Sequence, residues 1–211
     1  MRFVHFGHSC VLVESDSARL LFDPGTFSAG YEDLRDLTAI LITHQHFDHL
    51  DESKLPGLVK ANPDATLVVD PDTEPIVAKL GLTARVATAG DSFELGGAAI
   101  TVVGGHHAEI YNGVPDISNS AYLVDHGAFY HPGDALHVPE QAVDVLGAPV
   151  AAPWMKTSEA VDFLRAVKPR VAVPIHEAIL ASPEMGYGFL ENFSKDVAPL
   201  KPLTRGEATE V

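Results

Sequence analysis

The feature that most constrains this chain is a cluster of metal-binding side-chain types directly after an apolar run. Residues 43–49 read Thr-His-Gln-His-Phe-Asp-His and follow Ala-Ile-Leu-Ile. In an extended segment the side chains alternate, so His44 and His46 point the same way. The chain must then turn for Asp48 and His49 to face a second position nearby. Imidazole and carboxylate groups are ligands for Zn²⁺ and similar ions, so four of them in so short a stretch indicate two metal ions.

The cluster resembles the H-x-H-x-D-H signature of the metallo-β-lactamase-fold hydrolases, and the match is full. Three later segments follow in the order of that family, each at the end of an apolar run that looks like a strand. They are Gly104–Ala108 (Gly-Gly-His-His-Ala), Tyr130–Asp134 (Tyr-His-Pro-Gly-Asp) and Val171–His176 (Val-Ala-Val-Pro-Ile-His). The resemblance extends over nearly the whole chain, from Gly7 to His176. It is closest to the branch that resembles ascorbate-phosphate lactonase and the phospholipase-D-like lipid hydrolases.

The resemblance implies a site for two divalent metal ions, with Zn²⁺ as the first choice and Mn²⁺ or Fe²⁺ as alternatives. Its seven ligand positions form two sets and a bridge, namely His44, His46 and His107; Asp48, His49 and His176; and Asp134. One ion would bind each set, and the bridging carboxylate would bind both.

Two features of these motifs need comment. His106 and His107 are neighbours on a strand and face opposite ways, so only one of them can reach the metal. His107 is favoured because in similar proteins the ligand precedes a small residue, here Ala108. The Tyr130–Asp134 segment is followed by Ala135, where the family commonly has Thr. This change removes a hydroxyl that could hydrogen-bond to Asp134.

Other residues near the motifs are candidates for supporting roles. Asp23 ends a strand in an Asp-Pro-Gly turn, and in the resembling family an Asp at this place hydrogen-bonds a ligand histidine. His8 precedes the first expected strand and either lines the pocket or has a structural hydrogen bond. His106 is expected at the pocket wall or in solvent. His5, His126 and His137 are assigned to the surface or to loops. Possible substrate contacts, none favoured over the others, are Tyr111, Glu177 and Trp154.

Composition narrows the class of protein. The formal net charge is −15, with 14 basic and 29 acidic residues, which argues against binding to nucleic acid and to anionic membrane surfaces. Cys10 is the single cysteine, so an internal disulfide is excluded. The N-terminal residues lack a long apolar segment, and no stretch approaches the length of a transmembrane helix. We therefore expect a cytoplasmic protein of one domain, residues 1–211, that acts on a small molecule. Whether it forms a homo-oligomer is left open.

The order of apolar runs predicts two related halves. Residues 10–13 and 19–22 are expected to form a hairpin around 15–17, and residues 121–124 and 128–130 repeat that plan around 125–127. In each half a later strand delivers a histidine, at His44 and at His176. The two halves are expected to meet at one shared site.

Three helices are expected, at 157–167, 139–146 and 74–80. The first has Thr157 or Ser158 as its N-cap and ends before Lys168-Pro169, and the second has Pro at its first turn and Gly147 after its end. Strands and helices interleaved in this way fit a four-layer αββα sandwich of the α/β class. The family resemblance implies the same metallo-β-lactamase fold.

These observations predict a metal-dependent hydrolase in which two ions share a water molecule and present hydroxide to an ester-type bond of a lactone, another cyclic ester or a phosphodiester. Asp48 would orient the hydroxide as well as bind its metal. The group that protonates the leaving group is unassigned, and a metal-bound water, Tyr111 and His106 are its candidates. Two alternatives come from other classes. One is a protein that binds metal and ligand without turnover, and the other is a di-iron oxidoreductase on the same fold.

Overall fold

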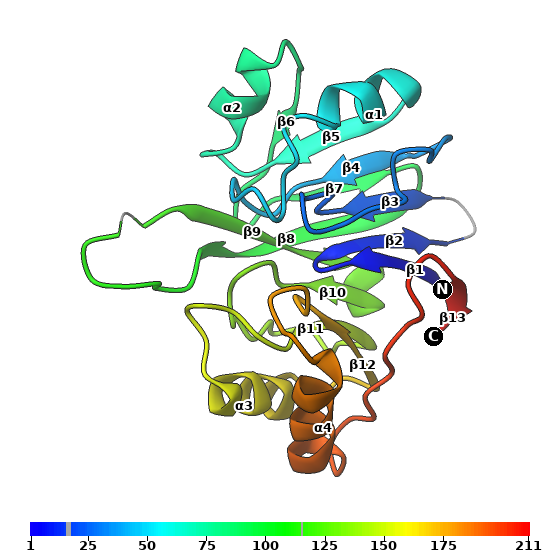
Figure 1. Cartoon of the computed structure of the whole chain (residues 1–211). Coiled ribbons are helices and arrows are strands. Elements are labelled where there is room, and N and C mark those ends of the chain that lie inside the picture. The colour runs from blue at the N-terminus through cyan, green and yellow to red at the C-terminus, as the bar shows by residue number, and fades with distance from the viewer. Residues whose placement is uncertain (16–17, 115) are drawn as a thin grey trace.

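The two β-sheets of this protein pack face to face, and helices cover their outer sides (Figure 1). The structure is a computed structural model that describes residues 1–15, 18–114 and 116–211. Figure 1 shows α1 and α2 at one end of the molecule and α3 and α4 at the other, with the sheets between them. This arrangement is the four-layer sandwich expected from the sequence.

The first sheet contains seven strands within the described ranges, in the spatial order β13-β1-β2-β3-β4-β5-β6. Its strands are β1 (Arg2–Gly7), β2 (Cys10–Glu14), β3 (Arg19–Phe22), β4 (Ala39–Leu41), β5 (Thr66–Val69), β6 (Arg85–Val86) and β13 (Ala208–Glu210). The predicted hairpin is β2 and β3, which pair antiparallel, and β3 to β6 then run parallel. Asp16 and Ser17 of its predicted loop lie outside the described residues.

The second sheet has six strands in the part of the chain that the structure describes, in the order β12-β11-β10-β9-β8-β7. Its strands are β7 (Ser92–Leu95), β8 (Ala98–His106), β9 (Ser118–Val124), β10 (Phe129–His131), β11 (Val145–Pro149) and β12 (Val171–Ile175). The second predicted hairpin is β9 and β10, joined by a 3₁₀ turn over Asp125–Gly127. In the first sheet β4 lies next to its hairpin, whereas in the second β11 separates β12 from β10.

Three groups of buried apolar side chains hold the four layers together. The central group lies between the sheets and includes Phe3, Phe22 and Tyr122. A second group joins the first sheet to α1 (Leu55–Ala61) and α2 (Glu74–Lys79), and a third joins the second sheet to α3 (Thr157–Val167) and α4 (Pro183–Ser194). Both faces of the central parallel strands are therefore buried, which explains why β4, β5, β11 and β12 read as continuous apolar runs.

Two of the three predicted helices are present, as α2 and α3. The N-cap of α3 is Lys156 and not the predicted Thr157 or Ser158, and its backbone N–H donates to the Glu159 carboxylate at 2.7 Å. No helix in the described ranges is long and apolar enough to span a membrane.

The predicted helix at 139–146 is wrong. Its last two residues, Val145 and Leu146, are fully buried at the start of strand β11, and the residues before them are irregular. β11 pairs with β10 on one side and β12 on the other, so ladder hydrogen bonds on both sides outweigh the helix signals of Pro139 and Gly147. The position of His8 is a second correction. It follows β1 and does not precede the first strand.

Candidate metal centre

The H-x-H-x-D-H loop is anchored directly after strand β4. The backbone N–H of Thr43 donates to Asp23 Oδ1 at 2.7 Å, and the N–H of His49 donates to the carbonyl of His46 at 2.9 Å, which turns the chain. At Gly25 a Cβ atom would lie 1.8 Å from the Asp48 carbonyl oxygen. Only glycine permits this close approach of the two backbones, so the Asp-Pro-Gly turn supports the loop from behind.

Four of the predicted ligands form one group. Donor atoms of His44, His46, His107 and Asp134 all lie within 4.8 Å of one another. His44 Nε2 is 3.1 Å from His46 Nδ1, and His107 Nε2 is 3.5 Å from Asp134 Oδ2. Two of these residues follow β4, one follows β8 and one follows β10, so the group joins the two sheets.

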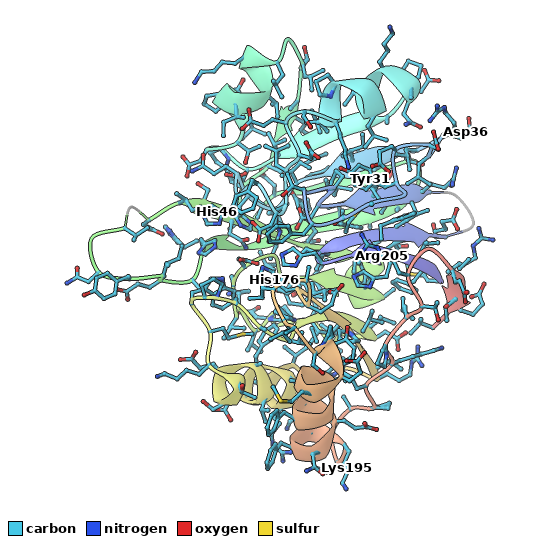
Figure 2. The ribbon with its side chains drawn as sticks, in the orientation of Figure 1. Tyr31, Asp36, His46, His176, Lys195 and Arg205 are labelled. Carbon is cyan, nitrogen blue, oxygen red and sulfur yellow. The ribbon has the colours of Figure 1, made fainter. Side chains whose placement is uncertain are left out.

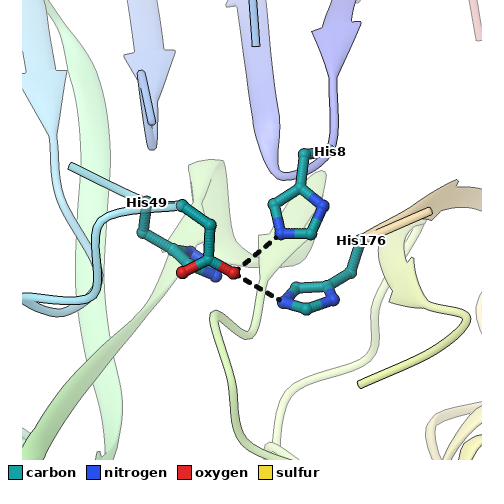
Figure 3. A group of neighbouring side chains, drawn as sticks. His8, His49 and His176 are labelled. Carbon is teal, nitrogen blue, oxygen red and sulfur yellow. Dashed lines mark hydrogen bonds and ion pairs between the residues drawn. The ribbon is translucent and has the colours of Figure 1, made fainter. Parts of the chain in front are cut away.

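A second group lies beside the first and contains His8, Asp48, His49 and His176. Asp48 Oδ2 is 3.0 Å from His8 Nε2 and 3.6 Å from His176 Nε2 (Figure 3). Figure 2 places His46 of the first group and His176 of the second in the central part of the molecule, between the two helical layers. His176 follows strand β12, as the sequence predicted.

Asp134 connects the two groups. Its Oδ1 atom is 3.1 Å from His49 Nε2 and 3.2 Å from His176 Nε2, while its Oδ2 atom faces His107. The preceding residue, Gly133, has a φ of +60°, and a Cβ there would lie 2.3 Å from Asn119 Oδ1. Asn119 accepts the Asp134 N–H at 3.0 Å, so the tight turn aims the carboxylate between both groups.

Three histidines are held with one ring nitrogen free. The Nδ1–H of His49 donates to Asp23 Oδ2 at 2.7 Å. The Nδ1–H of His107 donates to the Ala108 carbonyl and that of His176 to the Ala151 carbonyl, both at 2.6 Å. Their Nε2 atoms, together with Asp134 Oδ1, are buried without a hydrogen-bond partner among the described residues. Buried polar atoms normally have a partner, and metal-bound histidines are oriented by such Nδ1–H donors. The residues therefore fit divalent ions.

The spacing of the donor atoms agrees with this interpretation. Zn–N bonds of 2.0–2.1 Å in a tetrahedral site place neighbouring ligand atoms about 3.3 Å apart. The separations between ligand atoms given above run from 3.1 Å for His44 and His46 to 3.6 Å for Asp48 and His176. The other pairs within each group lie within 4.8 Å, so the side chains of each group could close around an ion.

Protonation also favours metal binding. Burial lowers the pKa of His44 well below its usual value, and the neighbouring His49 lowers it further. Burial opposes the ionisation of Asp48, but the hydrogen bond from His8 and the positive potential of His49 outweigh it and lower its pKa to about 2. A neutral imidazole and an ionised carboxylate are the forms that coordinate a metal.

His49 shows how strongly the site attracts positive charge. Burial acts to lower its pKa, but the carboxylates of Asp134 and Asp23 outweigh burial and raise the pKa well above the usual value. The pKa of Asp134 is lowered well below its usual value, because His49 and His176 outweigh its own burial. The carboxylates stabilise a positive charge here, which a proton or a divalent cation can supply.

The structure separates the two adjacent histidines. His107 lies in the first group and is buried, whereas the side chain of His106 is 77% exposed and its Nδ1 lies 2.9 Å from Asp116. Asp23 lies behind the loop and accepts from Thr43 and His49. His8 is in the second group. The assignment of His5 to the surface is wrong, because it is buried in β1 with Nε2 donating to the His8 carbonyl at 2.8 Å.

Sequence reasoning missed Thr43 and gave Trp154 no rank. Thr43 Oγ1 donates to Asp23 and lies 3.0 Å from His44 Nδ1, so it can accept the proton of that ring nitrogen. Trp154 Nε1 donates to Asp134 Oδ2 at 2.9 Å. It supplies the Asp134 carboxylate with a donor from outside the Tyr130–Asp134 segment, next to which Ala135 stands in place of the common Thr. The position of Thr43 directly before His44 was a usable signal, but Trp154 lies in a loop without periodicity.

A pocket of about 580 Å³ lies next to the first group. It is lined by Gln45, His46 and His107 from the metal centre and by the connection between β8 and β9, at residues 108–114, 116 and 117. In Figure 1 this connection extends from the sandwich beyond the ends of β8 and β9. The pocket gives a small molecule access to the candidate ligands.

The fold and this paired histidine and aspartate site define the class: a metallo-β-lactamase-type sandwich with a candidate dinuclear centre. The sequence profile of the "Beta-lactamase superfamily domain" matches residues 2–176. The chain therefore belongs to the β-lactamase superfamily.

Known proteins support this placement. Protein Rv0786c of Mycobacterium tuberculosis is 54% identical over 196 residues, covering 90% of this chain and 91% of its own length. A UPF0173 metal-dependent hydrolase of Pyrobaculum islandicum is 28% identical, with coverage of 83% and 84%. Among solved structures, the metallo hydrolase Igni18 of Ignicoccus hospitalis superposes with a TM-score of 0.77 at 22% identity, covering 100% of this chain and 98% of that one.

Proposed function

We propose that this chain is a metal-dependent hydrolase that cleaves an ester-type bond in a small molecule, such as a lactone, another cyclic ester or a phosphodiester. The observation that carries the proposal is the pair of ligand groups joined by Asp134, with bare histidine nitrogens facing its carboxylate. The Pyrobaculum relative is named a metal-dependent hydrolase, which supports the coarser class. The ester-type bond and the mechanism are the finer part of the proposal.

The two groups of side chains support an assignment of the residues that would hold the ions. The first would bind His44, His46 and His107; the second would bind Asp48, His49 and His176; and Asp134 would serve both. When bound, two divalent ions would share a water molecule, lower its pKa toward neutrality and thereby supply hydroxide, while also polarising the substrate oxygen. A nucleophilic side chain is then not required.

Asp48 is the residue with the most direct catalytic role. Its carboxylate is ionised at neutral pH, because its pKa is lowered to about 2. It can therefore accept a hydrogen bond from the attacking water and fix the direction of attack. Of the two side-chain candidates for protonating the leaving group, Tyr111 is among the residues that line the pocket and His106 is not. Tyr111 is thus the better placed.

The test of this function is the substitution Asp48→Asn. The change is nearly isosteric but removes the negative charge that orients the water and helps to hold the second ion. We expect turnover to fall by about 10²–10⁴-fold. Purified wild type and variant would be assayed against lactones, aryl esters and bis-aryl phosphodiesters, with chelator and metal add-back, and His106→Ala would serve as the matched control.

Chelator-sensitive hydrolysis in the wild type and in His106→Ala, but not in Asp48→Asn, is the expected result. Equal hydrolysis by wild type and Asp48→Asn at saturating metal would show that Asp48 does not orient the nucleophile. A protein that binds two ions but hydrolyses none of the three substrate classes would favour the metal-binding alternative without turnover.

A further inference from the structure

The pocket beside the metal centre carries information about the substrate. Three large hydrophobic residues on its wall are exposed to solvent. The exposed fraction is 39% for Ile110, 75% for Tyr111 and 48% for Val114. They belong to one projecting connection and face a pocket that continues to His46 and His107. Clustered apolar surface next to a polar site is typical of a place that a ligand covers.

The charges around the pocket have one sign. Its acidic lining residues are Glu109 and Asp116, and the Asp116 carboxylate lies 2.9 Å from His106 Nδ1. No Lys or Arg lines it among the residues that the structure describes, although the whole chain has 14 of them. An anionic group against this wall, away from the metal ligands, would meet like charge and find no basic side chain to bind it.

We propose that this pocket binds the apolar part of an uncharged ester or lactone, and that the wall carrying Glu109 and Asp116 disfavours an anionic group at that position. The inference rests on the proposed function and narrows its substrate class. Ile110, Tyr111 and Val114 would cover the apolar part of the substrate while its ester group lies at the metal centre. Glu109 and Asp116 would repel an anionic group placed against this wall.

Two dyes that share one aromatic core test the inference without measuring hydrolysis. N-phenyl-1-naphthylamine is neutral, and 1-anilinonaphthalene-8-sulfonate is the same core with a sulfonate. We expect the metal-free protein, in which no cation attracts the sulfonate, to bind the neutral dye at least about tenfold more tightly, because of like-charge repulsion at the pocket wall. The double variant Glu109→Gln, Asp116→Asn should reduce this difference in affinity. The double variant Tyr111→Ser, Val114→Ser should weaken binding of the neutral dye by about tenfold.

Phe189→Ser is the matched control, because Phe189 is an exposed apolar residue on the distant helix α4 and is 45% exposed. Its substitution should leave the affinity for both dyes unchanged. Tighter binding of the sulfonate, or neutral-dye binding that responds to Phe189 and not to Tyr111 and Val114, would overturn the proposal. Because the readout is equilibrium fluorescence, its failure is separable from a failure of the hydrolase proposal.

A different observation concerns His8. Its side chain is fully buried, and its backbone is held in the left-handed region at a φ of +53°. The His8 N–H donates to Glu177 Oε1 at 2.9 Å, and its carbonyl accepts from His5 Nε2 at 2.8 Å. This double anchor compensates the backbone strain and fixes the imidazole against Asp48.

The hydrogen bonds of the ring indicate its role. His49, His107 and His176 each donate from Nδ1, which leaves Nε2 free for a metal. His8 differs, because its Nδ1 is buried with no partner in the described part of the chain. A proton on Nδ1 would be a buried donor without an acceptor, whereas a proton on Nε2 is donated to Asp48 Oδ2 at 3.0 Å.

The geometry points to His8 as a positioning residue for Asp48, with its proton on Nε2, and not as a fourth ligand of the second ion. Nitrogen-15 NMR of the zinc-loaded protein should show the Nε2–H form for His8. We expect His8→Ala to weaken the second Zn²⁺ by about 10–100-fold, and His8→Gln, which keeps a donor, to stay within about threefold of wild type.

A zinc-bound Nε2 resonance for His8, or equal losses in the Gln and Ala variants, would show that His8 is a ligand. Unchanged zinc affinity in both variants would show that it does not position Asp48. Thermal unfolding of each metal-free variant would separate a loss of folding from a loss of affinity. The NMR measurement uses the wild type, so it stays decisive even when a variant fails to fold.

Discussion

At the scale of single residues, the candidate centre depends on which nitrogen of each histidine is kept free. Asp23 holds His49 by its Nδ1 atom, and backbone carbonyls hold His107 and His176 in the same way. These contacts lie outside the ligand groups, yet they set the direction of every free Nε2 atom. Substitutions behind the centre are therefore expected to affect metal affinity.

The adjacent histidines provide a matched pair. We expect His107→Ala to remove metal from the site that it shares with His44 and His46, since a ligand is lost. His106→Ala should keep the metal, because that side chain is exposed beside Asp116. Elemental analysis after dialysis measures both. Retention of metal by His107→Ala together with loss in His106→Ala would contradict the placement of these two side chains.

The motif and the alternation of side chains were enough to favour His107 over His106. Alternation could not predict that His5 is buried, because both faces of β1 are buried and a strand of that kind shows no alternating pattern. The contact of Trp154 could not be predicted from the sequence for a different reason. It comes to Asp134 from a loop 20 residues further along the chain, and only the fold brings the two together.

At the scale of elements, local pattern succeeded where burial was one-sided. Helix α3 has an apolar face and begins and ends where its sequence indicated. The helix predicted at 139–146 is absent because the sheet environment of β11 overrides the local helix signals. Helices α1 and α4 were missed, since both contain glycine within their length: Gly57 in α1, and Gly186 and Gly188 in α4.

Asp70 gives a prediction at this scale. It precedes helix α2, and its Oδ1 atom accepts from the backbone N–H of Asp72 at 2.9 Å and of Thr73 at 3.3 Å. Burial raises the pKa of Asp70 to about 6, although these hydrogen bonds lower it. A carboxyl whose pKa is higher in the folded state binds its proton more tightly when folded, so its contribution to stability is lost as pH rises from about 4 to about 6.

Asp70→Asn should remove this pH dependence. Between pH 4 and pH 7 the free energy of unfolding of the variant, relative to wild type, is expected to rise by about 1–3 kcal/mol. Urea unfolding of the metal-free proteins at both pH values measures the difference. A difference that does not change with pH would mean that Asp70 keeps its ordinary pKa in the folded protein.

At the scale of the whole molecule, the two halves predicted from the sequence are the two sheets, and the candidate centre lies where they meet. β4 of the first sheet leads to His44, while β8, β10 and β12 of the second lead to His107, Asp134 and His176. The order of motifs could predict this convergence, because each motif ends a strand. The pocket could not be predicted, since its wall is a connection without periodicity.

The central claim is that one carboxylate serves two metal ions, and metal content tests it most directly. The purified protein should hold close to two divalent ions per chain by elemental analysis. Asp134→Ala should lower the occupancy of both sites together, because Asp134 faces His49 and His176 with one oxygen and His107 with the other. One ion per chain, unaffected by the Asp134 substitution, would contradict the dinuclear centre.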